Sequence, residues 1–274
     1  MVRVIQIKID FHVTERIKRF VYVYMAETED WCVLIDSGVA GSENIIEQAI
    51  RKVGHKPSEL KAVLLTHAHP DHIGTAHYFR EKYGAKICAS QGECAWIEDI
   101  DLQFKERPIP NFYHLAGEST IVDQVVKAGD KIYLSDSNCV EVIGTPGHSA
   151  DQVSYRIDNV VFTGDSLPVR GDIPIFIDVN AARDSLKTLE QLPDAEVFYP
   201  AWDKTYSGDV MKEKLKQARN LIDELESIVW KVDHGQEVSA LTEQVCERLQ
   251  MPAWKNNPLF TRTVECCRRK EYLK

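Results

Sequence analysis

The stretch LLTHAHPDHIGT, Leu64–Thr75, limits what this chain can fold into more than any other part of the sequence. Within six positions it holds His67, His69, Asp71 and His72. These residues directly follow an aliphatic run that predicts a buried strand over Lys61–Thr66, and a helix is predicted over His72–Tyr83. Histidine is scarce in ordinary proteins, so chance at a surface turn explains the pattern poorly. We therefore expect a metal site at a strand-to-helix junction.

The spacing of the four side chains indicates how they could bind metal. Residues two apart in an extended segment face the same way, so His67 and His69 can point at one ion. Asp71 and His72 follow as the chain turns, and they can reach a neighbouring point. Imidazole and carboxylate without thiolate suit Zn²⁺, and also Fe²⁺ or Mn²⁺. One loop does not complete a site for two ions, so further ligands must come from other strand ends.

Two residues elsewhere in the chain meet this requirement. His148 lies in IGTPGHSADQ and Asp165 lies in VVFTGDSLP, each at a small, glycine-containing turn after a predicted strand. Taken alone, either residue would more often stabilise its turn. Together with the histidine loop, they are predicted to be metal ligands.

The hydrophobic pattern predicts one main domain with a helical extension. Three strands are expected in the first 36 residues, and a second round of strands and helices begins near Lys131. Helices are then predicted over Asp209–Val232, Ser239–Leu249 and Thr261–Leu273. We expect a domain over residues 1–208 and an extension over residues 209–274 that packs on it.

Two irregular segments are candidates for pocket walls. Asp101–Ser119 contains prolines and aromatics and predicts a loop over the pocket, with His114 as a substrate contact. Its alternative is a surface connection that is packed by its own aromatics. Arg170–Val179 follows Asp165 and is the second candidate wall.

The composition of the chain limits the kinds of partner that it can bind. The chain has 274 residues, is 44% hydrophobic and carries a formal net charge of −9, which disfavours nucleic acid as a partner. We expect no membrane partner because the sequence has no apolar run of bilayer length, and its first residues do not resemble a signal peptide. The seven scattered cysteines suit free thiols in the cytoplasm. We expect a small-molecule substrate, and homo-oligomerisation stays open.

The motifs THAHPDH, TPGHS and TGDS, in this order, resemble the metal-binding motifs of the metallo-β-lactamase superfamily. The resemblance covers roughly residues 1–205. It implies an α/β (α+β) fold, a four-layer αββα sandwich with the site at the edge of two packed sheets, here with a helical C-terminal appendage. It also implies a first metal on His67, His69 and His148, and a second on Asp71, His72 and the bridging Asp165. Asp36, in IDSG, would be a structural residue behind the ligands.

The same resemblance implies a hydrolase of the glyoxalase II or lactonase kind. Two divalent ions, zinc above all, would supply a metal-bound hydroxide that cleaves a small ester, thioester or lactone. Asp71 would be the catalytic residue that orients the hydroxide or shuttles a proton. One alternative is a mononuclear iron dioxygenase of the persulfide dioxygenase kind. A non-catalytic metal-binding protein is another.

The sequence departs from the superfamily pattern after the predicted strand EVFYP. Trp202 stands where another histidine is expected, and indole cannot ligate a metal. We expect Asp203 to serve as the ligand instead, which would favour Fe or Mn at the second site; otherwise that site is incomplete. Tyr206 is predicted to donate a hydrogen bond to a substrate carbonyl, and Lys204 to pair with a substrate carboxylate.

Overall fold

The computed structural model describes residues 2–136 and 138–268. Its first sheet has six strands in the order β1-β2-β3-β4-β5-β6. Their bounds are Arg3–Thr14, Ile17–Glu27, Cys32–Ile35, Leu60–Leu64, Lys86–Ser90 and Gln124–Val126. β1, β2 and β3 are antiparallel, whereas β3 to β6 run parallel. The carboxyl ends of β3 and β4 therefore meet at one edge, where Asp36 and the histidine loop begin.

The second sheet also has six strands, in the order β12-β11-β10-β9-β8-β7. In chain order, β7 to β12 span Lys131–Tyr133, Cys139–Gly144, Val153–Ile157, Val160–Gly164, Val197–Pro200 and Tyr206–Ser207. All neighbours are antiparallel except β10 and β11. The turn after β8 carries His148, and the turn after β10 carries Asp165.

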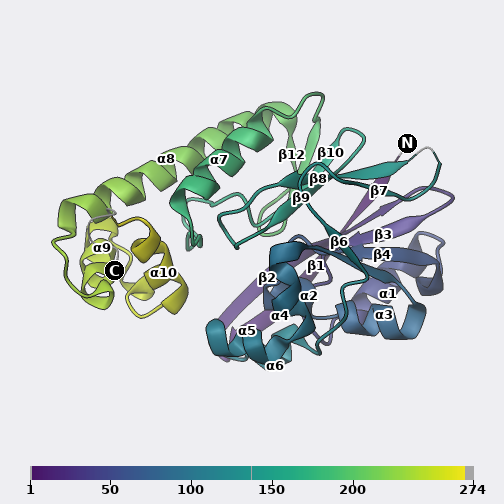
Figure 1. Ribbon diagram of the computed structural model, residues 1–274, viewed down its shortest axis with the longest axis horizontal. Helices are drawn as coiled ribbons and strands as arrows, with labels where there is room; N and C mark the ends of the chain where they lie inside the picture. The colour runs from purple at the N-terminus through teal and green to yellow at the C-terminus, as the bar shows by residue number, and fades with distance from the viewer. Residues whose placement is uncertain (1, 137, 269–274) are drawn as a thin grey trace.

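Helices cover the outer face of each sheet (Figure 1). Those of the first half are α1 (Glu43–Lys52), α2 (Pro70–Ile73), α3 (Ala76–Tyr83), α4 (Cys94–Glu98), α5 (Ile100–Glu106) and α6 (Phe112–Ala116). Those of the second half are α7 (Val179–Glu190), α8 (Gly208–Val232), α9 (Val238–Leu249) and α10 (Pro258–Cys266). Three short 3-10 helices lie at Pro57–Glu59, Gln91–Glu93 and Pro252–Trp254. This is the predicted four-layer αββα sandwich.

Three apolar cores hold the layers together. Between the sheets, Tyr24, Leu64 and Phe162 are buried in one cluster. Phe79 on α3 belongs to a second cluster, between the first sheet and its helices. Leu186 on α7 belongs to a third cluster, which also includes residues of α8, α9 and α10. This close packing of the layers holds the loops at the shared edge of the two sheets in place.

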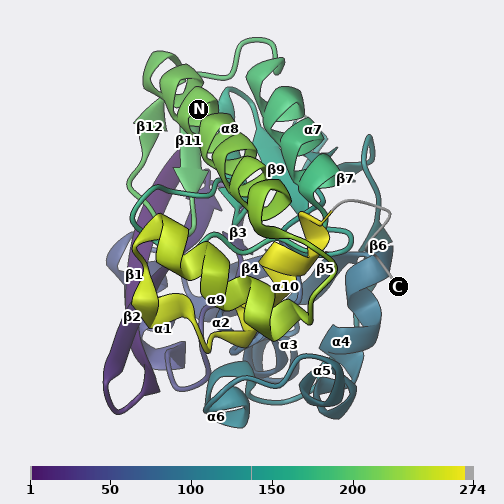
Figure 2. The same cartoon turned by 90° about the vertical axis from the view of Figure 1, so that its left-hand side faces the viewer.

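The C-terminal helices extend away from the second sheet and return beside the sheet edge. α8 leads away from β12, and α9 and α10 lie in front of the strands when the molecule is turned (Figures 1 and 2). The buried Phe260 of α10 joins the same core as α7 and α8. In the described part of the chain, no helix has both the length and the apolar character needed to cross a membrane.

The structure corrects two details of the predicted elements. The single helix expected over His72–Tyr83 is two helices, α2 and α3, interrupted at Gly74 and Thr75. The segment Asp101–Ser119 is not loop throughout, because α5 and α6 lie within it; Asp99 starts α5 by accepting a hydrogen bond from the Leu102 N–H. The last predicted helix extended to Leu273, and its residues 269–273 lie outside the described part.

Candidate metal centre

Four side chains from three loops converge at the sheet edge. They are His67, His69, His148 and Asp165, whose ligand atoms all lie within 4.8 Å of one another. Nε2 of His67 is 3.0 Å from Nδ1 of His69, and Nε2 of His148 is 2.8 Å from the same atom. Oδ2 of Asp165 lies 3.3 Å from His148 Nε2. Ligand atoms around a tetrahedral zinc ion are about 3.4 Å apart, so this group has the spacing of a metal site.

A second group of ligand atoms adjoins the first and shares Asp165 with it. Oδ1 of Asp165 lies 3.3 Å from Nε2 of His72, and Oδ2 of Asp71 lies 3.6 Å from the same nitrogen. The two carboxylate oxygens of Asp165 therefore face different groups. These are the six residues that the sequence motifs predicted.

Buried polar atoms without partners indicate that a cation fits here. Among the described residues, Asp71 Oδ2, His72 Nε2 and Asp165 Oδ1 are buried and accept or donate no hydrogen bond. Leaving such atoms unsatisfied is costly, and a bound cation would satisfy all three. The donor set of imidazole nitrogens and carboxylate oxygens matches a divalent transition metal.

The electrostatics of the site favour the metal-binding form of three histidines but not of His72. Burial alone would lower the pKa of His72, but the carboxylates of Asp165, Asp36 and Asp71 raise it well above the usual range. Burial lowers the pKa of His67 and His69 well below the usual range, and lowers that of His148 to about 4. These three imidazoles are therefore neutral at pH 7, as metal ligation requires. Burial raises the pKa of the Asp71 carboxyl. For Asp165, burial alone would raise the pKa, but the neighbouring His72 and His148 lower it.

Asp36 and Thr66 orient the histidines from behind. Oδ2 of Asp36 accepts a hydrogen bond from Nδ1 of His72 at 2.8 Å, and Oδ1 accepts the Thr66 N–H at 2.8 Å. The Thr66 hydroxyl lies 3.0 Å from Nδ1 of His67. Asp36 reaches this position from a left-handed backbone conformation, with φ of 60°. Both histidines thus present Nε2 to the centre, which agrees with the structural role predicted for Asp36.

Glu93 connects the two ligand loops, and no sequence motif pointed to it. It is 2% exposed and accepts hydrogen bonds from the Ala68 N–H at 2.9 Å and the Ser149 hydroxyl at 2.6 Å. It also accepts the Asp151 N–H at 3.0 Å. Ala68 lies between two of the ligands, and its carbonyl accepts a further bond from the buried Gln103. The backbone of the histidine loop is therefore held from both sides.

Gly164 allows the loop that carries Asp165 to approach the histidine loop. Its φ is +51°, and a Cβ atom there would lie 2.7 Å from the Thr66 hydroxyl oxygen. Gly147, just before His148, is similarly confined: a Cβ would lie 2.3 Å from the Ala182 nitrogen. Both turns need glycine for the close contact as well as for the backbone angle.

The predicted role of Asp203 is not supported by the geometry. Asp203 and Asp165 line the same small space of about 140 Å³, but both oxygens of Asp203 accept local hydrogen bonds. Oδ1 accepts the Lys204 N–H at 2.8 Å, and Oδ2 accepts the hydroxyl of Tyr206. In this structure the carboxylate is therefore engaged by its own turn, and metal ligation by Asp203 stays a prediction.

Three other predicted contacts also lie away from the centre. Tyr206 is 3% exposed and packs in the core of the second sheet, where its hydroxyl donates a hydrogen bond to Asp203. Lys204 is exposed, and so is His114 on α6. None of these three lines the cavities beside the metal group. Local sequence could not show which way these side chains turn.

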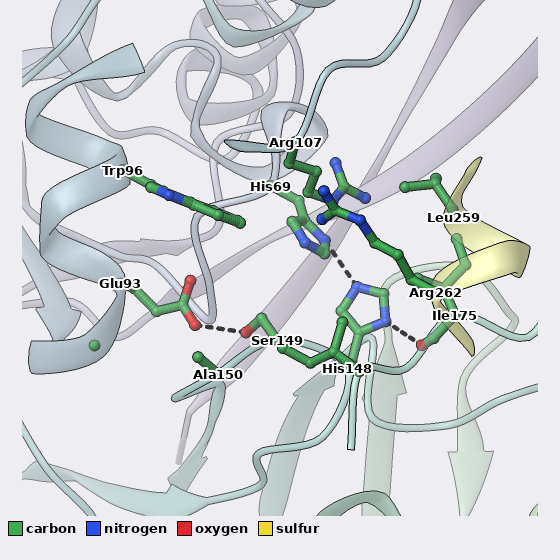
Figure 3. A pocket seen from close by; sticks show the side chains of 12 residues that line it. His69, Glu93, Trp96, Arg107, His148, Ser149, Ala150, Ile175, Leu259 and Arg262 are labelled. Carbon is green, nitrogen blue, oxygen red and sulfur yellow. Dashed lines mark hydrogen bonds between the residues drawn. The ribbon is translucent and has the colours of Figure 1, made fainter. Parts of the chain in front are cut away.

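Two cavities meet at the metal group, and both predicted wall segments contribute to them. The smaller cavity, of about 240 Å³, includes Trp96 and Ser149, and we call it the polar cavity because the charged Glu93, Arg107 and Arg262 line it (Figure 3). The apolar cleft, of about 480 Å³, includes Phe11, Ile17, Ile109, Leu115, Asp71, Asp165, Trp202 and Trp254. His69, Arg107, His148, Ile175 and Leu259 line both. Sequence reasoning missed Arg107 and Arg262 because neither belongs to a motif.

An αββα sandwich with histidine and aspartate ligands at the shared edge of its sheets defines a class of metal-binding proteins. The chain belongs to the metallo-beta-lactamase superfamily, which it matches over residues 16–202.

Similar proteins have been described in several bacteria. The chain is 31% identical to "Probable metallo-hydrolase YqgX" of Bacillus subtilis over 152 residues, which cover 53% of this chain and 64% of the relative. It is 28% identical to a hydroxyacylglutathione hydrolase of Mesorhizobium japonicum over 196 residues, 68% of this chain and 67% of that one. The chain thus spans about two thirds of the length of these curated relatives.

Solved structures show the same fold at low identity. The metallo-beta-lactamase family protein TTHA1429 of Thermus thermophilus superposes with a TM-score of 0.70 at 16% identity. The superposition covers 97% of this chain and 90% of that one, so it includes the C-terminal helices. The subclass B3 metallo-beta-lactamase BJP-1 of Bradyrhizobium japonicum superposes over 80% of this chain and 93% of that one, with a TM-score of 0.60 and 20% identity.

Proposed function

We propose that this protein is a metal-dependent hydrolase that binds two divalent ions and cleaves a small ester, thioester or lactone. The observation that carries the proposal is the position of Asp165. Its Oδ2 faces His148 at 3.3 Å, and its Oδ1 faces His72 at 3.3 Å, so one carboxylate can bridge two ions. A bridging carboxylate relieves the repulsion between two such cations.

The residues of each group suggest which ions they hold. The first group offers three imidazole nitrogens and one carboxylate oxygen, a set that suits zinc. The second group offers Nε2 of His72 with oxygens of Asp71 and Asp165, and this oxygen-rich set favours Fe²⁺ or Mn²⁺ more than the first does. Divalent ions bound here lower the pKa of a coordinated water and polarise a substrate carbonyl.

The protein's own residues can move a proton and position the substrate. Asp71 lines the apolar cleft, and burial raises the pKa of its carboxyl. Such a group can accept a proton from the attacking water and return it to the departing alcohol or thiol. His69 and His148 line both cavities, so a substrate carbonyl next to them can extend one arm into each.

The relatives support a thioester among the substrate candidates. Several of them are named hydroxyacylglutathione hydrolase, at 26–32% identity. The apolar cleft of about 480 Å³ is within the range of small-molecule sites.

Metal analysis of a matched pair of variants, combined with a substrate panel, tests the proposal. His69→Ala should lose the ion of the first group and nearly all hydrolysis of esters, thioesters or lactones, because His69 Nδ1 lies at the centre of that group. His77→Ala should keep both, because His77 is bonded to the Ser119 carbonyl outside the site. Unchanged metal content in His69→Ala would refute the assignment.

A mononuclear iron dioxygenase is a second candidate. It is favoured by the completeness of the first group, whose four ligand atoms suffice for one ion. Oxygen uptake with a persulfide substrate and one iron per chain would replace the hydrolase proposal. Binding of metal with neither reaction would indicate a non-catalytic metal-binding protein.

A further inference from the structure

Arg107 is a buried cation beside the candidate metal centre. It follows α5, is 6% exposed and lines both the polar cavity and the apolar cleft. Within residues 2–136 and 138–268, its guanidinium forms no ion pair and donates no side-chain hydrogen bond; only its backbone N–H is bonded, to the Gln103 carbonyl. Its side-chain nitrogens are not among the fully buried unpaired atoms, so they face the cavities, and five N–H donors remain available to a ligand.

A second guanidinium reaches the same cavity from the C-terminal extension. Arg262 lies on α10, lines the polar cavity with Arg107, and donates a hydrogen bond to the Glu106 carbonyl (Figure 3). Burial lowers the pKa of Arg107 to about 10, and the positive charge of Arg262 acts in the same direction. The chain thus places two like charges on the lining of one cavity.

Among the described residues, no carboxylate forms an ion pair with Arg107 or Arg262. Asp71 and Asp165 attract Arg107 at longer range, but their oxygens belong to the candidate metal groups. Glu93 is nearby as well, yet it is already engaged by three donors from the ligand loops. When the centre holds divalent ions, the carboxylates are committed to them and the arginine charges are left unpaired.

The apolar cleft lies on the other side of His69 and His148. One wall comes from the β1–β2 hairpin, with Phe11 and Ile17, and the opposite wall comes from the extension, with Trp254 and Leu259. Ile109 and Leu115 complete the lining near Arg107. Apolar side chains contribute most of the exposed lining of this space, which suits an apolar chain, and the charged Arg19 and Asp172 that also line it pair with each other.

We propose that the substrate is amphiphilic: an oxyanion group, carboxylate or phosphate, binds to Arg107 and Arg262, and an apolar arm lies in the cleft. This proposal rests on the proposed hydrolase function and names its substrate class. The scissile acyl carbon lies between the two arms, next to His69 and His148. Water oxygen bonds to that carbon, the C–O or C–S bond breaks, and the leaving alcohol or thiol takes the proton.

The test compares substrates that differ only in the anion. 4-Nitrophenyl hexanoate is neutral, mono-4-nitrophenyl adipate has the same chain length with a terminal carboxylate, and a phosphate-terminated ester of equal length distinguishes the two oxyanions. The wild-type enzyme should prefer an anionic ester. Arg107→Gln should lower kcat/KM for that ester about 100-fold and Arg262→Gln about 10-fold, with less than about a threefold change for the neutral ester.

Arg219→Gln is the matched control. Arg219 pairs with Glu190 on the outer helices, at 2.7 Å, so its loss removes the same charge far from the cavities. It should leave the preference for the anionic ester unchanged. If Arg107→Gln and Arg262→Gln also leave that preference unchanged, the proposal is wrong although the hydrolase function stands.

Binding provides a readout that does not depend on turnover. Calorimetry should show that hexanoate or hexyl phosphate binds the wild-type protein at least about tenfold more tightly than Arg107→Gln, with and without added metal, whereas hexanamide binds both equally. Equal binding of the anions would overturn the proposal even if no ester is hydrolysed. Arg107→Gln should not lower Tm, because it removes an unpaired buried charge; a lower Tm with unchanged binding would assign Arg107 a purely structural role.

Discussion

Nδ1 of His72 donates a hydrogen bond to Oδ2 of Asp36 over 2.8 Å. This bond orients the imidazole, so Nε2 faces Asp71 and Asp165 and is the nitrogen that a metal ion could bind. That nitrogen is buried and has no hydrogen-bond partner among the described residues. A residue that lies outside the candidate ligand set therefore determines how one ligand is presented.

Asp36→Asn should weaken metal binding about 10- to 100-fold, because an amide can turn an N–H toward His72 and reverse its tautomer. Competition with a chromophoric chelator would measure the affinity. Asp30→Asn changes an exposed turn residue in the same way and should have no effect. Equal affinity in the two variants would show that Asp36 does not control the ligand.

Glu93→Gln should both destabilise the fold and weaken metal binding. The carboxylate accepts from Ala68, Ser149 and Asp151, and an amide can replace only part of these bonds. We expect a loss of about 2–4 kcal/mol in the free energy of unfolding, measured with urea. Glu118→Gln, at a side chain that is 78% exposed, is the control. A stability loss with unaltered metal affinity would separate Glu93 from the positioning of the ligand loops.

The local motifs predicted which histidine and aspartate side chains converge at the sheet edge, whereas contacts between distant segments could not be predicted. His67 and His69 follow from alternation in an extended segment, and the fold follows from hydrophobic periodicity and the superfamily motifs. Arg107 and Arg262 come together only because α10 returns to the sheet edge. Asp203 was predicted as a ligand from its position beside Trp202, but its turn directs the carboxylate to Tyr206.

Gly164→Ala should cost more stability than an equivalent change at an open glycine. At Gly164 a Cβ would lie 2.7 Å from the Thr66 hydroxyl oxygen, whereas at Gly129, with φ of +91°, it would meet nothing within 4 Å. Gly129→Ala should therefore cost about 1 kcal/mol from backbone strain alone, and Gly164→Ala about 1–3 kcal/mol more. Only Gly164→Ala should also reduce metal affinity. Similar losses at both sites would show that the contact with Thr66 is unimportant.

The free energy of unfolding should fall at acid pH because the carboxylate of Glu47 becomes protonated. Burial alone would raise its pKa, but hydrogen bonds from Tyr78, Tyr83, Arg51 and Lys82 lower it from 4.5 to about 2. Because the pKa of Glu47 is lower in the folded protein than in the unfolded chain, ionised Glu47 contributes fully to the free energy of unfolding above pH 4.5. This contribution is lost as the pH falls toward 2. Glu47→Gln should cost about 2 kcal/mol at pH 7, and its difference from wild type should shrink below pH 4.5. Urea unfolding at several pH values measures the difference in stability between wild type and Glu47→Gln. A difference that does not depend on pH would contradict the prediction. Glu29→Gln, at an exposed residue, is the control.

Trp202→His should strengthen the second metal group. The indole nitrogen of Trp202 is buried without a hydrogen-bond partner in the described structure, and Trp202 and Asp165 line the same cavities. Imidazole at this position would add a nitrogen ligand to a group that otherwise has one nitrogen, from His72. Titration with Zn²⁺ should show a second binding step at least about tenfold tighter than in the wild-type protein.

Trp202→Phe separates ligation from packing. The Trp202 ring stacks under Arg19, whose Cζ lies 4.4 Å from the ring centroid, and Arg19 forms a bidentate ion pair with Asp172. Phenylalanine keeps an aromatic face for this arrangement but adds no ligand, so the second binding step should stay as in wild type. If the histidine and phenylalanine variants give identical titrations, the side chain at position 202 does not reach the second ion. The second ligand group is then complete without a residue from the turn after β11.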